Sequence, residues 1–323
     1  MTLLITGASS GIGKAAAALF AERGYQVFDL SRRGTIPCDV TDEASVQRAV
    51  AEVMRRTDHI DVLILNAGFG ISGPAECTPV EDVRRQMDVN FTGAVAVVQQ
   101  VLPYMRRRRK GRIIFTSSVA AILPIPYQSF YSASKAAINA FALALQNEVR
   151  DYGIRVSVLM PGDVRTGFTA ARKKVQLPIG DAGVSPAVNT GGAGISPAGN
   201  TGDAGVSPAG NIGEAGLSPA GMGERLEVYP DTIGSCTTTQ MFSPFKEVSE
   251  IAYPHAEQAV ATMERDEQHG LTPQAMAHCL YRIATARHPR PQYIGGAEYH
   301  LFAFLHRLLP QRLVNYIVGK LYS

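Results

Sequence analysis

The 323-residue sequence predicts an α/β fold, in which one doubly wound parallel sheet is covered by helices on both faces. Short aliphatic runs alternate with longer segments whose apolar residues recur at helical spacing, and a glycine-rich turn follows the first run. Strands that alternate with helices form βαβ units, whose sheet is buried on both sides. With 46% hydrophobic residues and a net charge of +3, the chain can build a large core but is too balanced in charge to coat nucleic acid.

Each expected element follows from its local pattern. We expect a strand where aliphatic residues form a short run bounded by glycine, proline or polar residues, and a helix where apolar residues recur every three or four positions. The expected strands are 2–6, 27–30, 62–65, 112–116 and 155–160, with a last strand near residue 293. The expected helices are 14–23, 42–56 with Thr41 as its cap, 89–105, 132–152 and 273–286.

A shift in composition separates residues 174–224 from the rest of the chain. The motif A-G-[VIL]-S-P-A recurs there with a period of 11, beginning at Ala182, Ala193, Ala204 and Ala215. Glycine and proline in every repeat exclude a coiled coil, and a single apolar residue per repeat makes a solenoid core thin. We expect a flexible insertion, with a short β-solenoid as the alternative.

The cysteines and the apolar runs bear on the location of the protein. The four cysteines lie far apart without metal-ligand or disulfide spacing, and the N-terminus lacks a basic leader. No run approaches the roughly 18 apolar residues of a transmembrane helix. We therefore expect no metal site, no transmembrane segment and a cytoplasmic location.

The first expected strand runs into Thr6-Gly7-Ala8-Ser9-Ser10-Gly11-Ile12-Gly13, which opens the first helix. Glycines let the backbone turn tightly and approach phosphates closely, and the helix N-terminus offers free N–H groups and a positive dipole end. A tight turn without a ligand is the alternative. Because a strand and a helix flank the turn, we expect it to bind the pyrophosphate of a dinucleotide.

Tyr131 and Lys135 are spaced i, i+4 on an expected helix, so their side chains share one face. A tyrosine is a poor acid or base at neutral pH, and a nearby ammonium favours its phenolate. Such a pair can move a proton to a carbonyl, although an exposed helical tyrosine and lysine is the default alternative. Ser117 and Ser118, at a strand end just upstream, offer a hydroxyl to the reacting oxygen.

Together these motifs resemble the short-chain dehydrogenase/reductase superfamily. T-G-A-S-S-G-I-G, Asn66-Ala67-Gly68, Asn90, Ser118, Y-S-A-S-K from Tyr131, and Pro161-Gly162 with Thr166 occur in the order and spacing of that family. The resemblance implies a Rossmann-type fold and an oxidoreductase that uses a nicotinamide dinucleotide.

The resemblance also implies a role for each matched residue. Tyr131 would be the general acid/base, and Lys135 would lower its pKa and hold the nicotinamide ribose. Ser118 would polarise the substrate carbonyl, and Asn90 would place a water in the proton relay. The implied cofactor-binding residues are Gly7, Ser9, Ser10, Gly11, Ile12, Gly13, Ser31, Arg32, Asp39, Val40, Asn66, Ala67, Gly68, Tyr131, Lys135, Pro161, Gly162 and Thr166.

Two of these assignments have structural alternatives, since Asp39 could merely cap a turn and Asn66 could only tie strands together.

The choice of cofactor depends on the end of the second strand, where relatives that prefer NAD carry a carboxylate for the ribose hydroxyl. Ser31 stands there, followed by Arg32 and Arg33, and arginine suits a phosphate. We expect NADP(H) to be favoured over NAD(H), with a solvated arginine pair as the alternative.

Beyond residue 245 the sequence resembles the 17β-hydroxysteroid dehydrogenase-like and retinol dehydrogenase-like branch, so we expect residues 1–323 to form one domain in which 245–323 cover the substrate. The tail 301–321 is apolar and carries Arg307, Arg312 and Lys320. Packing over the cleft or a subunit partner is favoured, with peripheral membrane contact as the alternative.

The resulting functional hypothesis is hydride transfer between a nicotinamide cofactor and a small lipophilic secondary alcohol or ketone of hydroxysteroid or retinoid type. The alternatives are a 3-ketoacyl-type reductase and a nucleotide-sensing binding protein without turnover. We also expect a homo-oligomer that binds no nucleic acid.

Overall fold

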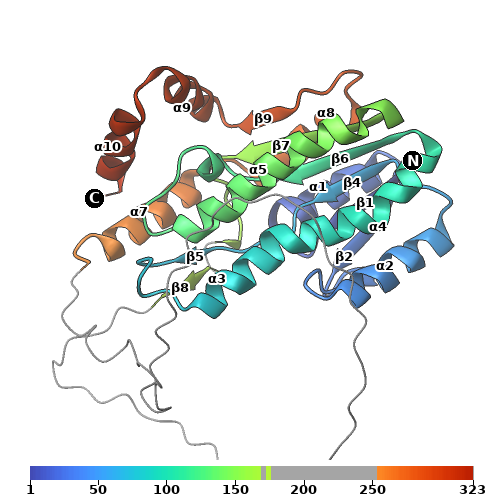
Figure 1. Cartoon of the computed structure of the whole chain (residues 1–323), viewed down its shortest axis with the longest axis horizontal. Helices are drawn as coiled ribbons and strands as arrows, with labels where there is room; N and C mark the ends of the chain where they lie inside the picture. The colour runs from blue at the N-terminus through green and yellow to red at the C-terminus, as the bar shows by residue number, and fades with distance from the viewer. Residues whose placement is uncertain (169–171, 176–252, 323) are drawn as a thin grey trace, which may run out of the picture. The chain divides into compact units, whose positions relative to one another are not determined.

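Among the described residues, seven parallel strands form the central sheet of the computed structural model (Figure 1). They lie in the order β3-β2-β1-β4-β6-β7-β9. Their bounds are β1 Thr2–Thr6, β2 Gln26–Ser31, β3 Ile36–Pro37, β4 Val62–Leu65, β6 Gly111–Thr116, β7 Ile154–Pro161 and β9 Gln292–Gly295. The predicted doubly wound parallel sheet is therefore confirmed, with β3 as a short strand that the pattern did not predict.

The structure describes residues 1–168, 172–175 and 253–322. The chain divides into two units, Met1–Pro178 with Ile251–Ser323 and, separately, Ile179–Glu250. All described residues belong to the first unit. The expected insertion at 174–224 lies outside the described residues except for Lys174 and Val175, so its interpretation stays a prediction.

Helices pack against both faces of the sheet. One face carries α2 (Glu43–Arg56), α4 (Gly93–Arg108) and α5 (Ser129–Val149), and the other carries α1 (Gly11–Glu22) and α8 (Pro273–Thr285). The remaining described elements are β5 Ile71–Ser72, α3 Val80–Met87, β8 Lys173–Lys174, α7 Ala256–His269, α9 Ala297–Leu308 and α10 Gln311–Leu321, together with short turns of helix at Asp88–Thr92, Val119–Ala121 and Arg150–Tyr152.

The strand residues divide the core between the two faces. Leu4 and Leu63 pack with α2, α4 and α5, whereas their neighbours Leu3, Ile5 and Ile64 pack with α1 and α8. All five side chains are fully buried. Successive strand side chains point to opposite faces, so a strand buried on both sides must be aliphatic at every position. This explains why the strands appear in the sequence as unbroken aliphatic runs.

Four helix starts differ from the predicted ones, and the first of these is α1, which begins at Gly11, three residues before its predicted start. The predicted helix 89–105 corresponds to the π-turn at Asp88–Thr92 and to α4, and α3 precedes it without having been predicted. The N-cap of α2 is Asp42, whose side chain accepts from Ala44 N at 2.9 Å, while Thr41 donates to Asp39 at 2.7 Å. Helix α5 begins at Ser129, three residues before the predicted start. Helix ends depend on local capping contacts, which periodicity does not report.

The apolar tail forms α9 and α10, which bury Ala303 and Val314. Several large apolar side chains on these helices remain exposed, namely Leu301, Phe304, Leu308, Tyr316 and Leu321. Within the described residues, no helix is both long and apolar enough to pass through a bilayer. The inner side of the two helices lines a small apolar cavity, described below.

A buried carboxylate joins three elements at the amino end of the sheet. Asp61 is 8% exposed and accepts hydrogen bonds from Thr2 N and from the Arg108 guanidinium, each at 2.8 Å. The His59 Nε2 atom lies 3.1 Å from the same carboxylate. Burial alone would raise the pKa of Asp61, but these hydrogen bonds and charges outweigh it and hold the pKa below its ordinary value.

We expect Asp61→Asn to lower the free energy of unfolding by about 1–3 kcal/mol at neutral pH, because it removes a charged acceptor from two donors. A carboxylate whose pKa is lowered by folding stabilises the protein above its unfolded pKa of about 4 and loses this effect as the pH falls. Urea unfolding should therefore give a constant difference from wild type above about pH 5, which shrinks below about pH 4. Asp151→Asn, at an exposed carboxylate, is the control; a difference that does not shrink in acid would contradict the assignment.

Candidate active site

The carboxyl ends of β1, β4, β6 and β7 meet at one edge of the sheet. Thr6 pairs with Leu65, Leu65 with Phe115, and Phe115 with Val158, so the residues that follow these strands are brought together. A cavity of about 720 Å³ opens at this edge and extends from the glycine-rich turn past Tyr131 to α7. Ligands of open α/β sheets bind at such an edge.

The glycine-rich turn has the backbone that a phosphate-binding turn requires. Gly7 has φ of 69°, a conformation that favours glycine, and Asn66 Nδ2 donates to its carbonyl at 3.1 Å. A Cβ on Gly13 would lie 2.3 Å from that same carbonyl, so only glycine lets α1 pack this closely. The extended Ser10 makes no side-chain cap hydrogen bond, which leaves the N-terminal N–H groups of α1 to a ligand.

The residues expected near the adenosine lie along the same cavity. Ser31 ends β2, as predicted, and it lines the cavity with the exposed Arg32 and Arg33. Asp29 does not line it, because its carboxylate accepts from Ala8 N at 3.1 Å and from the Ser31 hydroxyl at 3.0 Å. The residues present therefore fit a dinucleotide with its pyrophosphate at the turn.

Asp39 and Asn66 each make a structural contact of the kind considered above as an alternative to cofactor binding. Asp39 Oδ1 accepts from the backbone and the hydroxyl of Thr41, and these bonds lower the pKa of Asp39. Asn66 links the end of β4 to Gly7. Both side chains still line the cavity, so a structural contact and a ligand contact are compatible at each position.

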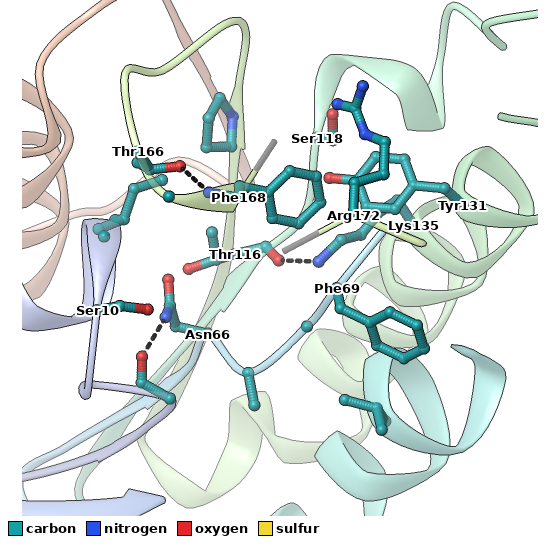
Figure 2. A pocket seen from close by; sticks show the side chains of 18 of the residues that line it. Ser10, Asn66, Phe69, Thr116, Ser118, Tyr131, Lys135, Thr166, Phe168 and Arg172 are labelled. Atoms are coloured by element: carbon teal, nitrogen blue, oxygen red, sulfur yellow. Dashed lines mark hydrogen bonds between the residues drawn. The ribbon is translucent and has the colours of Figure 1, made fainter. Parts of the chain in front are cut away.

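Tyr131, Ser118 and Lys135 lie together on one wall of the cavity, as Figure 2 shows. Tyr131 and Lys135 project from the same face of α5, and the Lys135 Nζ atom lies 5.8 Å from the centre of the Tyr131 ring. Ser118 forms a hydrogen bond with the tyrosine hydroxyl. The neighbouring Ser117 instead donates to the Lys135 carbonyl at 3.0 Å, which leaves Ser118 as the hydroxyl that faces the cavity.

Burial decides the protonation of this pair in the cofactor-free protein. Desolvation raises the pKa of Tyr131 to about 12, against the effect of the Ser118 hydrogen bond, so the phenol is protonated at neutral pH. Desolvation also lowers the pKa of Lys135 to about 8, and its ammonium donates to the Thr116 carbonyl at 3.0 Å. The tyrosine is therefore poised as an acid and the lysine as a buried cation.

Two predicted residues, Gly13 and Asn90, lie behind the cavity wall, whereas the other predicted site residues all line it. Asn90 is 1% exposed and belongs to the π-turn. Its amide donates to Ser134 Oγ and to the Phe69 carbonyl, each at 3.0 Å, and accepts from Phe69 N at 2.9 Å. Asn90 thus supports the loop after β4 rather than facing the open cavity.

Motif spacing did not find the other residues that line the cavity. Among them, the segment after Thr166 and the C-terminal part contribute Phe168, Arg172, Met263, Glu267 and Tyr322. The Phe168 ring lies 5.6 Å from that of Tyr131, and Figure 2 places Phe168 and Arg172 beside it. No periodicity or motif distinguishes these residues, because tertiary contacts between distant segments bring them to the site.

The sequence and its structure match known proteins. The short chain dehydrogenase family model matches residues 1–176. A 3-ketodihydrosphingosine reductase of Bacteroides thetaiotaomicron is 44% identical over 183 residues, which are 54% of this chain and 68% of that relative. A short-chain dehydrogenase structure from Streptomyces avermitilis aligns over 95% of this chain and 94% of its own, with a TM-score of 0.65 and 21% identity.

A third match is a 3-ketoacyl-(acyl-carrier-protein) reductase from Brucella melitensis, whose structure contains NADH. It is 27% identical and covers 53% of this chain and 79% of its own, with a TM-score of 0.51. Because the family model spans more than half of the chain, the protein belongs to the short-chain dehydrogenase/reductase family. It is an oxidoreductase of this family, whose members bind NAD(H) or NADP(H).

We expect Lys135→Met to stabilise the cofactor-free protein at neutral pH by about 1–3 kcal/mol, because it removes a buried charge whose desolvation is incompletely offset. A lysine whose pKa is lowered by folding destabilises the protein most below its folded pKa of about 8, and this cost disappears as the pH rises towards its unfolded value. The gain in melting temperature over wild type should thus be largest near pH 7 and shrink by about pH 10. A variant that is less stable than wild type at neutral pH would contradict this account.

Proposed function

We propose that the protein is an NADP(H)-preferring oxidoreductase that interconverts a lipophilic secondary alcohol and its ketone. The observation that carries this proposal is the group of Ser118, Tyr131 and Lys135 on the wall of a cavity that borders an apolar one. The second cavity measures about 220 Å³ and lies under α9 and α10. Val119, Ile125 and Tyr322 line both, so a ligand that reacts at Tyr131 can extend into apolar surroundings.

The proton chemistry follows from the state of the side chains. In ketone reduction Ser118 donates a hydrogen bond to the carbonyl oxygen, and the protonated Tyr131 gives that oxygen its proton. Lys135 places a positive charge next to the phenolate that remains, and its ammonium can hold the ribose hydroxyls. A nicotinamide dinucleotide, when bound, supplies the hydride. Asn90 would support the proton relay indirectly, by holding the loop after β4 in place.

The remaining site residues are assigned to the cofactor by their positions in the cavity. The glycine-rich turn would hold the pyrophosphate, Asp39 and Val40 the adenine, and Asn66 and Gly68 the adenosine side. Thr166, with Pro161 and Gly162, would face the carboxamide. The Thr166 hydroxyl already accepts from Phe168 N at 3.1 Å, so it couples this end of the cavity to the residues beside Tyr131.

The apolar cavity favours a lipid-like substrate. The name of the Bacteroides thetaiotaomicron relative denotes reduction of a keto sphingoid base, which supports a lipid-like ketone as substrate here. A hydroxysteroid or retinoid remains within the same chemical class. Residues 253–322 would then cover the substrate, in keeping with the positions of Met263 and Tyr322 on the cavity wall.

A 3-ketoacyl-type reductase is the second candidate, and the likeness to the Brucella melitensis structure favours it. The C-terminal helices weigh against it, since they line the site with apolar side chains where a carrier protein would need access. A nucleotide-sensing protein without turnover is disfavoured, because a binder has no need of Ser118 and Tyr131 together.

We expect Tyr131→Phe to reduce kcat for a ketone substrate by about 100- to 10,000-fold, because it removes the proton donor. NADPH binding, measured by fluorescence titration, should stay within a few-fold of wild type. Tyr152→Phe, at a half-exposed tyrosine on the surface, is the matched control. Turnover within a few-fold of wild type in the Tyr131 variant would exclude the proposed mechanism.

We expect Arg32→Asp to shift the ratio of kcat/KM for NADPH over NADH towards NADH by about 10-fold or more, because a carboxylate repels the 2'-phosphate and accepts from a 2'-hydroxyl. Arg48→Asp, at an exposed arginine of α2, should leave the ratio unchanged. If the ratio does not move in the Arg32 variant, the adjacent Arg33 or Ser10 sets the preference.

A further inference from the structure

An ion pair that belongs to no sequence motif lies in the catalytic cavity. Arg172 follows the Thr166 segment and Glu267 lies on α7, and their side chains pair although they are 95 residues apart. The side chain of Arg172 is 1% exposed and that of Glu267 is 13% exposed. Both residues line the cavity that contains Ser118 and Tyr131, and Figure 2 shows Arg172 beside Tyr131.

The pair leaves hydrogen-bonding capacity unused. One guanidinium nitrogen of Arg172 binds Glu267 Oε1 and another lies 3.9 Å from the Met263 sulfur. Arg172 Nε and Glu267 Oε2 are buried and have no hydrogen-bond partner in the part of the chain that the structure describes. A buried polar atom without a partner costs about 1–3 kcal/mol, so a ligand group that satisfies it gains affinity.

The charges at this end of the cavity favour a cationic donor. Asp163 also lines it, so two carboxylates face one guanidinium, a formal charge of −1. The Tyr299 hydroxyl donates to the Asp163 carboxylate, whereas Glu267 retains a free oxygen. Burial raises the pKa of Glu267 to about 7 although the Arg172 charge opposes it, so a second cation would stabilise its carboxylate. An anionic group would be repelled here.

The ion pair lies in the cavity of the reacting centre, which borders the apolar cavity. Glu267, Arg172 and Asp163 line the same cavity as Tyr131, and Figure 2 shows Arg172 beside the tyrosine ring. Tyr322 borders both cavities, and the second one has an almost wholly apolar lining. A ketone held at Tyr131 would thus have both the charged pair and the apolar space within the cavities that it occupies.

We propose that Arg172 and Glu267 form a head-group subsite that binds an amino group on the carbon next to the reacting carbonyl of an aliphatic ketone. The Glu267 carboxylate accepts from the ammonium, and Arg172 positions the carboxylate. The chain of the ketone occupies the apolar cavity. This inference rests on the proposed reduction of lipophilic ketones and specifies the substrate class as amphiphilic amino ketones.

The experiment compares two medium-chain ketones that differ only in the amino group next to the carbonyl. We expect wild type to prefer the amino ketone, and Glu267→Gln to raise its KM by about 10- to 100-fold with kcat little changed, because a charged hydrogen bond is lost in binding. Loss of the Glu267 charge also acts on Tyr131, and this effect is common to both ketones. The ratio of kcat/KM for the amino ketone over the plain ketone should therefore fall by about 10- to 100-fold, and a melting temperature close to that of wild type shows that the variant is folded. Glu264→Gln is the matched control, since Glu264 lies one turn away on α7 and pairs with Lys174 outside the cavity.

The outcomes separate the subsite from the proposed function. Equal efficiency of wild type on both ketones, or an equal loss on both in Glu267→Gln, would overturn the subsite while leaving ketone reduction intact. Turnover of neither ketone would count against the proposed function. Calorimetric titration of both ketones into the NADPH-loaded protein then decides the subsite: a preference of wild type for the amino ketone that Glu267→Gln abolishes supports it, and equal affinities overturn it.

Discussion

The parallel register of β1, β4, β6 and β7 is the constraint on which the site depends. Because the four strands run in one direction, their carboxyl ends lie side by side. Each strand therefore delivers a residue to the same edge, and these are Gly7, Asn66, Ser118 and Gly162, which all line one cavity. An antiparallel neighbour would carry its next residue to the opposite edge. The aliphatic strands thus serve the site indirectly, since their burial keeps the register.

The proposed role of Lys135 and the stability of the fold would make opposite demands on α5. Lys135 is 4% exposed, and its desolvation lowers its pKa. A buried ammonium is costly, and one carbonyl, that of Thr116, offsets only part of the cost. The helix can carry this charge because its other inward residues, such as Ile138, Ala142 and Leu145, pack into the main core. The apolar core therefore supports a polar site that would not be stable alone.

In the proposed reaction, the C-terminal part would contribute specificity rather than the basic chemistry. Tyr131 and Ser118 come from the first half of the chain, whereas Glu267, Met263 and Tyr322 bring a charged and an apolar wall to the same cavity. Short-chain dehydrogenases share the nucleotide-binding framework, and a fold by itself does not define a substrate. The features that would select the substrate are those farthest from the family motifs.

The sequence by itself determined the sheet, its flanking helices, the glycine-rich turn and the Tyr131–Lys135 pair. Each of these depends on residues within a few positions of one another, where spacing and backbone geometry determine which side chains are neighbours. Tertiary structure alone decided that Asp29 is held by Ala8, that a π-turn places Asn90 behind the cavity, and that Arg172 meets Glu267. Such contacts join segments that are far apart in the sequence. Their distance in space is set by the packing of the whole core, and their separation along the chain carries no information about it.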